Sequence, residues 1–312
     1  MNLQNRGETR DMIYAKSGNN DFIQRITRSK LNGFIHSTFK HTLNIQCLED
    51  GELYTIACKE IDNGPNTLIV DAASIKEWNV QVNDKVCTGN NHISLGNKLT
   101  ITIERANCWE GILPTYPTDI FVLKKNVEQM KRHIETYGTG GGIKSKSFCE
   151  SPFELEMSKM LHERTNLVLN ELLNKQIQRA LKHAVSLIGL GPGLTPSGDD
   201  FLVGLFTTFH LNGSYLSQHK EFCKEIEKVA KTATNDISYM ALKKASDGKV
   251  RESIITLIEV LLTGEKEELI LSLNNVLNIG SSSGTDIALG ILAGLEINFK
   301  NGGLLNDCSS NS

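Results

Sequence analysis

The first hundred residues contain short stretches in which apolar and polar side chains alternate. The alternation runs through residues 41–48, 53–58 and 99–104, and residues 67–70 form a short continuous apolar run. A hydrophobic period of two predicts β-strands with one buried face. Turn-forming residues separate these stretches, for example at 49–51 and 62–65. Because no long helical pattern lies between them, we expect an antiparallel sheet or a small barrel.

The hydrophobic period changes to that of a helix at about residue 118. An apolar stripe covers residues 118–137 and ends at a run of glycines, 138–142, and Pro152 then stands at the first position of a long helical pattern that extends to about residue 187. Further helical patterns cover 215–246, 250–263, 266–277 and 286–299. The predicted fold is α+β, with an N-terminal antiparallel β domain followed by an all-helical domain that carries two glycine-rich loop-to-helix corners. The predicted divisions are a flexible N-terminus (1–20), a β-rich domain ending in a helix (21–137), a glycine-rich linker (138–150), a helical domain with ligand loops (151–300) and a flexible tail (301–312).

Composition excludes several classes of protein. The net charge is −3, with 33 basic and 36 acidic residues, which argues against a nucleic-acid surface. No apolar run reaches the ~18 residues that span a membrane, and the N-terminus shows no secretory signal. The seven cysteines are scattered and form no CxxC pair, so the sequence indicates neither a zinc site nor a disulfide framework. We therefore expect a cytoplasmic protein without nucleic-acid or membrane partners.

The most unusual stretch is residues 189–200, which read Gly-Leu-Gly-Pro-Gly-Leu-Thr-Pro-Ser-Gly-Asp-Asp. Its glycines and prolines exclude a continuous helix or strand, and the apolar residues that follow predict a buried helix. A glycine-rich loop leading into a helix places free backbone N–H groups and the positive end of the helix dipole at one point, where an anion is favoured. The stretch does not match a P-loop, because Asp199 and Asp200 stand where Lys and Ser or Thr are required.

The pattern of this corner occurs a second time. Residues 197–204 and 283–290 both read Ser-Gly-x-Asp, then three apolar residues, then Gly. Two loop-to-helix corners with the same sequence pattern predict a paired site in which two helix N-termini face one ligand. The alternative is a structural role, because Ser followed by Asp three residues later is also a capping box at the start of a helix. Capping does not account for the glycines at 189, 191 and 193.

The predicted site residues come mainly from these two corners. The catalytic candidates are Asp199, Asp200 and His36. The substrate-binding candidates are Gly189, Gly191, Gly193, Thr195, Ser197, Gly198, Ser281, Ser282, Ser283, Gly284, Thr285, Asp286 and Lys40. His36 and Lys40 would supply positive charge opposite the acidic corners, although a solvated strand face explains them equally well.

The aspartates allow two charge arrangements. In the first, Asp200 and Asp286 cap helices, while Asp199 binds a polar group such as a carbamoyl NH₂. In the second, Asp199, Asp200 and Asp286 hold Mg²⁺, which prefers oxygen ligands and bridges to a phosphate. The sequence leaves both open.

Residues 189–200 and 280–286, together with Gly33-Phe34-Ile35-His36-Ser37-Thr38-Phe39 and Asn44, resemble a bacterial family typified by AllH, a subunit of oxamate carbamoyltransferase. The resemblance spans residues 30–300. It implies a role in purine (allantoin) breakdown, where this enzyme interconverts oxalurate plus phosphate with oxamate plus carbamoyl phosphate. It also implies partner subunits resembling AllF and AllG.

Three functions stay open on the sequence. The first is a subunit of a carbamoyl-transfer enzyme that binds a small anionic substrate, such as carbamoyl phosphate or oxamate, at the paired corners. The second is a Mg²⁺-dependent hydrolase of a phosphorylated small molecule. The third is a non-catalytic ligand-binding or assembly subunit.

Overall fold

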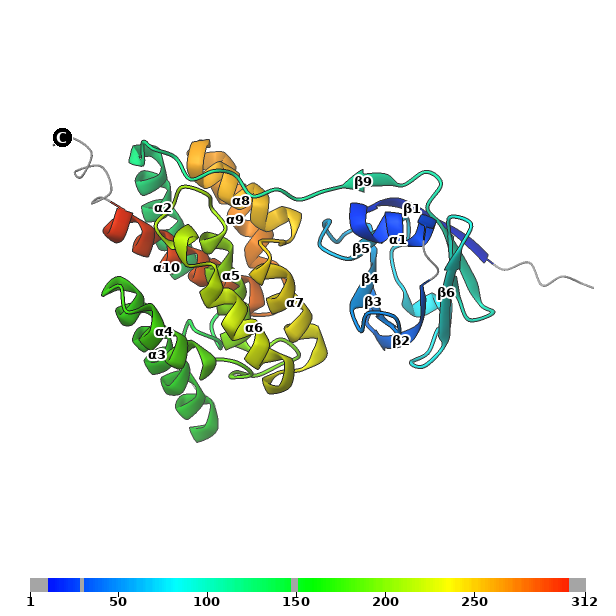
Figure 1. Ribbon diagram of the computed structural model, residues 1–312, viewed down its shortest axis with the longest axis horizontal. Helices are drawn as coiled ribbons and strands as arrows, with labels where there is room; N and C mark the ends of the chain where they lie inside the picture. The colour runs from blue at the N-terminus through cyan, green and yellow to red at the C-terminus, as the bar shows by residue number, and fades with distance from the viewer. Residues whose placement is uncertain (1–10, 29–30, 147–150, 303–312) are drawn as a thin grey trace, which may run out of the picture. The chain divides into compact units, whose positions relative to one another are not determined.

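The computed structural model describes residues 11–28, 31–146 and 151–302, and its contacts divide the chain into two units between Gly111 and Ile112 (Figure 1). The first unit contains the strands and one short helix. The second is helical. None of the helices within the described ranges combines the length and the apolar content that a membrane crossing requires.

Eight strands of the first unit close into a barrel, and a ninth extends one of them. The elements are β1 (Asp11–Asn19), α1 (Asn20–Arg28), β2 (Asn32–Thr38), β3 (Thr42–Cys47), β4 (Leu53–Cys58), β5 (Thr67–Val70), η1 (Lys76–Trp78), β6 (Lys85–Gly89), β7 (His92–Leu95), β8 (Leu99–Thr102) and β9 (Asn107–Trp109). The order around the sheet is β5-β4-β3-β2-β6-β7-β8-β1, and a pairing of β5 with β1 closes the ring. The predicted β domain is therefore confirmed in its barrel form.

Strand β1 closes the barrel because its two halves pair with different neighbours. Its first half runs parallel to β8, with Ile13 opposite Ile101, and its second half runs antiparallel to β5, with Ala15 opposite Val70. The end of β1 also pairs with β9. Residues 11–19 were expected to belong to a flexible N-terminus, and the structure corrects this. The stretch alternates weakly, and its strand is defined by partners 50 to 90 residues away, which a local pattern does not reveal.

The inward-facing residues of the strands form the core of the barrel. Ile35, Ile45 and Ile56 are fully buried there. Helix α1 adds Phe22 and Ile26 to the same cluster. Burying these side chains supplies the main stabilisation of the unit, at about 25 cal/mol for each Å² of apolar surface.

The second unit begins with the helix that the sequence assigned to the β domain. Helix α2 (Phe121–Tyr137) packs on helices α8, α9 and α10. The other helical elements are α3 (Pro152–Leu173), α4 (Ile177–Val185), α5 (Ser197–Phe209), η2 (Leu216–His219), α6 (Glu221–Ala233), α7 (Asp236–Ser246), α8 (Glu252–Thr263), α9 (Lys266–Leu277) and α10 (Ser283–Gly302). The division therefore lies before α2 and not in the glycine run after it, because the apolar stripe of α2 is buried on the helical unit.

The predicted helix at 151–187 is two helices. Ser151 caps α3 by accepting a hydrogen bond from the Glu154 N–H, with Pro152 at the first position as expected. The chain then turns between α3 and α4, where Lys175 has a φ of 59°. A left-handed lysine carries no sequence signal, so the break was not predicted.

Helices α5 and α10 are the centre of the helical unit. Every residue of α5 is buried. The two helices pack closely because each has a glycine where it meets the other: a Cβ on Gly204 would lie 2.0 Å from the Ile287 carbonyl oxygen, and one on Gly290 would lie 2.1 Å from that of Phe201. Gly204 and Gly290 hold the same position in the repeated pattern, so the two corners are related by an approximate two-fold axis through this crossing.

Candidate functional site

The first glycine loop connects α4 to α5 and is built on left-handed glycines. Gly189, Gly191 and Gly193 have φ values of 71°, 125° and 96°, in the region that favours glycine. Two of them also have no room for a side chain, since a Cβ on Gly189 would lie 2.6 Å from the Ala233 carbonyl oxygen and one on Gly191 would lie 2.5 Å from the Ser197 nitrogen. Gly193 has open space around it. The loop is therefore fixed in shape at its start and accessible near Gly193.

Asp199 fixes this loop from within. Its Oδ1 accepts a 2.8 Å hydrogen bond from the Gly189 N–H, and its Oδ2 accepts one from the Thr234 hydroxyl at the end of α6. Burial raises the pKa of Asp199, and these two donors lower it. Because both oxygens are used inside the chain, Asp199 acts here as a brace between α5, the loop and α6.

The backbone N–H groups at the start of α5 are largely used inside the chain as well. Gly198 donates to the Leu190 carbonyl, and Asp199 and Asp200 both donate to the Pro196 carbonyl. The expectation of free N–H groups at this helix start is therefore wrong for Gly198, Asp199 and Asp200, because the loop folds back over the start of α5. The capping box is also wrong for α5, since its N-cap is Pro196, without a side-chain cap.

The second corner is covered by the glycine run that the sequence read as a linker. Thr139 N–H donates to the Thr285 hydroxyl at 2.9 Å, and Ile143 N–H donates to Asp286 Oδ1 at 2.7 Å. Gly142 lies directly against the Asp286 carboxyl, where a Cβ would come within 2.2 Å of Oδ2. Residues 138–143 are thus part of the site.

The two corners touch each other. The Thr195 and Ser283 hydroxyls form a 2.8 Å hydrogen bond between them. Across the same contact, Ser283 lies close enough to Asp200 to lower its pKa, and Ser197 does the same for Asp286. Each aspartate of the repeated pattern therefore faces the serine of the other copy, as the approximate two-fold axis requires.

Asp200 and Asp286 are buried carboxyls with unused bonding capacity. Asp200 is 6% exposed and Asp286 is fully buried. Burial raises the pKa of each to about 7, and for Asp200 the nearby charges of Asp286 and Asp199 raise it further. Oδ2 of each carboxyl and the Ser197 hydroxyl are buried without a hydrogen-bond partner. Buried polar atoms are almost always paired, so three of them at one place indicate a functional site.

A cavity of about 320 Å³ lies on the other side of the glycine run that covers Asp286: Gly141 lines it, whereas the next residue, Gly142, lies against the Asp286 carboxyl. Its wall comes from all three glycine-rich segments and from the start of α3. The polar part of the wall contains Thr139, Ser158, Ser281, Ser282, Lys146 and Glu154, and the last two form a 3.1 Å ion pair. Cavities that hold small molecules begin at about 300 Å³. The cavity therefore has the size and the donors for a small polar anion.

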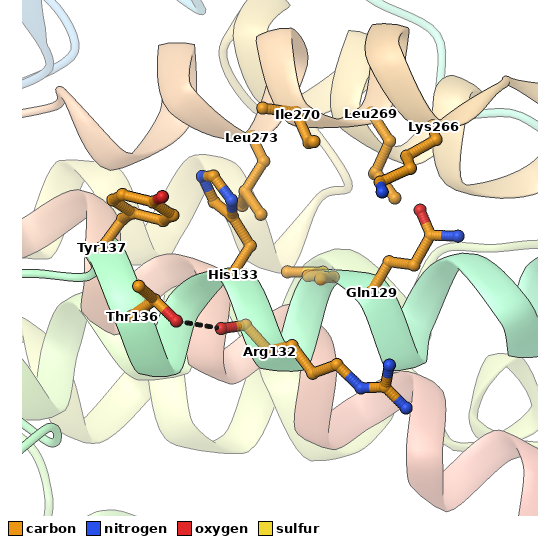
Figure 2. Close-up of a pocket in the computed structure, with 10 residues that line it drawn as sticks. Gln129, Arg132, His133, Thr136, Tyr137, Lys266, Leu269, Ile270 and Leu273 are labelled. Carbon is orange, nitrogen blue, oxygen red and sulfur yellow. Dashed lines mark hydrogen bonds between the residues drawn. The ribbon is translucent and has the colours of Figure 1, made fainter.

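A second cavity of about 330 Å³ lies between α2 and α9 (Figure 2). His133 reaches into it from α2, and its Nε2 lies 2.8 Å from the Asn274 side-chain oxygen. Its ring packs against that of Tyr137, with the two planes tilted by 35°. The apolar part of the wall comes from Met130 of α2 and from Leu269, Ile270 and Leu273 of α9, and Arg132 and Lys266 also line the cavity. None of the predicted site residues lines this cavity, and no unpartnered carboxyl adjoins it among the described residues.

Family models match both units of the chain. The model described as oxamate carbamoyltransferase subunit AllH matches residues 187–295, which include both corners. The model described as the AllH family N-terminal domain matches residues 14–108, which is the barrel. The chain belongs to the AllH family. No solved structure matches it.

In this AllH-family chain the barrel candidates are placed separately from the corners. His36 lies at an irregularity of β2, with Nδ1 3.2 Å from the Ser37 hydroxyl, and Lys40 is exposed between β2 and β3. Both belong to the first unit, whereas the corners belong to the second. That they face one another stays a prediction.

The three aspartates do not form a metal cluster in the described part of the chain. Only one group of three potential ligands there has its atoms within 4.8 Å of one another, and it consists of barrel residues. Asp199, moreover, already accepts two hydrogen bonds. The geometry therefore does not support the arrangement with Mg²⁺. It also differs from the other arrangement, because the Asp199 oxygens expected to bind a carbamoyl NH₂ already accept hydrogen bonds inside the chain, and α5 has no side-chain cap.

The site contains residues that the sequence did not single out. Thr139, Gly142, Ile143 and Lys146 come from the segment after α2, and Thr234 comes from the end of α6. The run of glycines at 138–142 was the available signal, because glycine marks close approach as well as flexibility. Thr234 had no signal, since its role depends on the packing of α6 against the loop.

Proposed function

We propose that this protein is the substrate-holding subunit of a carbamoyl-transfer enzyme of the oxamate carbamoyltransferase type. The observation that carries the proposal is the meeting of three distant glycine-rich segments at one small cavity that is lined by a lysine and several hydroxyls. Two buried carboxyls with unpartnered oxygens lie behind one of these segments, at Gly142. The AllH family supplies the reaction class. A purely structural corner has no need for buried carboxyl oxygens without partners.

The site offers different chemistry on the two sides of the glycine run. On the open side, Lys146 and the hydroxyls of Ser281 and Ser282 bind the phosphate of carbamoyl phosphate or the carboxylate of oxamate. Asp286 and Asp200 do not line the cavity but lie behind the glycine run, where their unpartnered oxygens would favour an NH₂ group. A small anion that also carries an amide group would therefore find donors for its anionic end and acceptors for its NH₂ end.

The chemistry proceeds by positioning and electrostatic stabilisation, without a covalent intermediate on this chain. The carbamoyl carbon passes between the nitrogen of oxamate and an oxygen of phosphate, and the anionic groups are neutralised by fixed donors. Partner subunits resembling AllF and AllG complete the enzyme, and its place is in the breakdown of purines by way of allantoin. His36 and Lys40 remain proposed sources of positive charge.

Calorimetric titration of the purified chain tests the proposal. Carbamoyl phosphate and oxamate are titrated separately, each with and without Mg²⁺. We expect saturable binding that does not depend on Mg²⁺ and that weakens about tenfold or more in Lys146→Met, because a charge-assisted bond to the anion contributes about 1.5–3 kcal/mol. Lys159→Met is the matched control, since Lys159 is an exposed lysine of α3 that does not line the cavity.

The outcomes separate the alternatives. Equal binding by wild type, Lys146→Met and Lys159→Met would place the ligand elsewhere. Binding that requires Mg²⁺ would favour the hydrolase. Binding without turnover, either alone or with the partner subunits, would identify a non-catalytic subunit, and no binding of either compound would contradict the proposal.

A further inference from the structure

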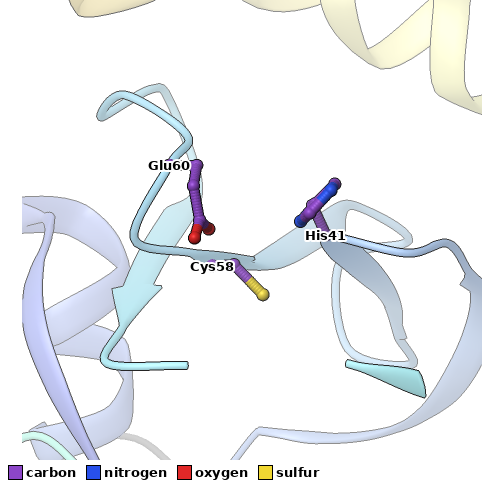
Figure 3. Close-up of side chains that lie close together, drawn as sticks. All are labelled: His41, Cys58 and Glu60. Atoms are coloured by element: carbon purple, nitrogen blue, oxygen red, sulfur yellow. The ribbon is translucent and has the colours of Figure 1, made fainter. Parts of the chain in front are cut away.

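A second chemical cluster lies in the barrel, far along the chain from the glycine corners. It consists of His41, Cys58 and Glu60, whose potential ligand atoms all lie within 4.8 Å of one another. Figure 3 shows the Glu60 carboxylate and the His41 ring approaching from either side of Cys58. We propose that these three residues bind a zinc ion at the end of strands β3 and β4.

The strand pairing holds the cluster together. Strands β3 and β4 are antiparallel, with Thr42 opposite Ala57, and the Cys58 N–H donates a 2.8 Å hydrogen bond to the His41 carbonyl. His41 and Cys58 are therefore neighbours across the ladder. The chain then forms a turn in which the Ile61 N–H donates a hydrogen bond to the Cys58 carbonyl. This turn places Glu60 beside His41 and Cys58. The backbone thus positions the three side chains before any ion arrives.

The state of each side chain is suited to a ligand. His41 Nδ1 is buried and has no hydrogen-bond partner. Cys58 is fully buried and reduced, and Glu60 is exposed at the surface. The neighbouring Lys59 is paired with Asp71, so it does not neutralise the Glu60 carboxylate at short range. A buried nitrogen without a partner is unfavourable, and a metal ion would satisfy it.

The ligand types select the metal. A thiolate with an imidazole and one carboxylate suits Zn²⁺ and not Mg²⁺ or Ca²⁺, which take oxygen ligands. Tetrahedral zinc with Zn–S of about 2.3 Å and Zn–N of about 2.0 Å brings its ligand atoms to about 3.5 Å from one another. Closing from within 4.8 Å requires movements on the order of 1 Å, which the exposed Glu60 turn allows. Three protein ligands leave the fourth tetrahedral position for a water molecule, as is usual at zinc sites with three protein ligands.

Binding is accompanied by the loss of a proton from sulfur. Cys58 is a free cysteine and its side chain is fully buried in the core of the barrel. When Zn²⁺ binds, the S–H bond breaks, the S–Zn bond forms and the proton goes to solvent.

Titration of the full chain with Co²⁺, as a spectroscopic substitute for Zn²⁺, tests the proposal. We expect one ion per chain, a thiolate-to-cobalt charge-transfer band in the near ultraviolet, and displacement of the cobalt by one equivalent of Zn²⁺. Zinc should also raise the Tm of the barrel, and a chelator should reverse the increase. Glu60→Gln, at an exposed position where folding is not at risk, should weaken Zn²⁺ binding by about tenfold or more.

Two further variants separate a built site from accidental binding. Cys58→Ser should abolish the charge-transfer band. Cys87→Ser, which removes an exposed thiol of the same barrel, should leave the band and the affinity unchanged. If the band is absent in the wild type, persists in Cys58→Ser or depends on Cys87, or if Glu60→Gln binds like the wild type, the cluster holds an adventitious ion only and the proposal is wrong.

Discussion

The pH dependence of stability at Asp286 is the sharpest test of the buried carboxyl pair. Asp286 is fully buried at the start of α10, with one oxygen bonded to the Ile143 N–H and the other without a partner. In Asp286→Asn the amide oxygen keeps the bond to Ile143. The new NH₂ lies near the Ser197 hydroxyl, which has no other partner and accepts a hydrogen bond. The substitution therefore removes the ionisable group at small structural cost.

The magnitude follows from the pKa. Burial raises the pKa of Asp286 from 3.8 to about 7, so the folded protein holds a proton that the unfolded chain loses between about pH 4 and pH 7. Stability of the wild type thus falls as pH rises through this window. At 1.36 kcal/mol for each pH unit, the full cost is about 4 kcal/mol above pH 7. Relaxation around the site reduces this, and we expect Asp286→Asn to be about 2–4 kcal/mol more stable than wild type at pH 8.

Urea unfolding at several pH values between 4 and 8.5 measures this difference. The two proteins should have nearly equal free energies of unfolding at pH 4 and diverge up to about pH 7. Glu128→Gln is the control, because Glu128 is an exposed carboxyl on α2 and its replacement should change stability little at any pH. Two outcomes would refute the claim that ionising Asp286 destabilises the folded protein. One is a difference in stability that does not change with pH, and the other is an Asp286→Asn protein that is less stable than wild type at every pH.

Three further substitutions test the packing around the site, each by urea unfolding at pH 7. Gly204→Ala should destabilise the protein by about 1–3 kcal/mol or more, because the added methyl group meets the backbone of α10. Gly302→Ala is the control and should be nearly neutral, since a methyl group there meets nothing within 4 Å. Equal effects of the two substitutions would disprove the close crossing of α5 and α10. Thr195→Val should cost about 1 kcal/mol by removing the hydrogen bond between the corners, and no loss would mean that the bond is weak or absent in solution. Lys144→Met should cost about 1–2 kcal/mol, because its ammonium donates to three carbonyls at the end of α2, and an unchanged stability would contradict that cap.

Local patterns in the sequence were sufficient for the class of fold. Alternation at 41–48 and 53–58 corresponds to β3 and β4, and the stripe at 118–137 corresponds to α2. These elements are defined by their own side chains, since one face is apolar and the other polar. Strand β1 and the place of α2 were not predicted correctly, because both depend on partners distant in the sequence.

The candidate site was predicted in part for the same reason. The repeated Ser-Gly-x-Asp pattern indicated two related helix starts, and the structure joins them through Thr195 and Ser283. Individual roles within the corners depend on donors from other segments. Asp199 accepts hydrogen bonds from Gly189 and Thr234, whereas Gly142 packs against the Asp286 carboxyl. Neither set of contacts has a fixed spacing in the sequence.

The central place of α10 has a consequence for how the protein is made. The barrel is complete once residue 109 is synthesised, whereas α5, buried along its whole length, obtains its closest neighbour only from residues 283–302. During translation the barrel is therefore able to fold while the ribosome still carries the helical unit, whose apolar α5 stays uncovered until the last helix emerges. Ribosome-bound chains that end before residue 283 should accordingly be substrates for chaperones, with a folded first unit and an unfolded second one.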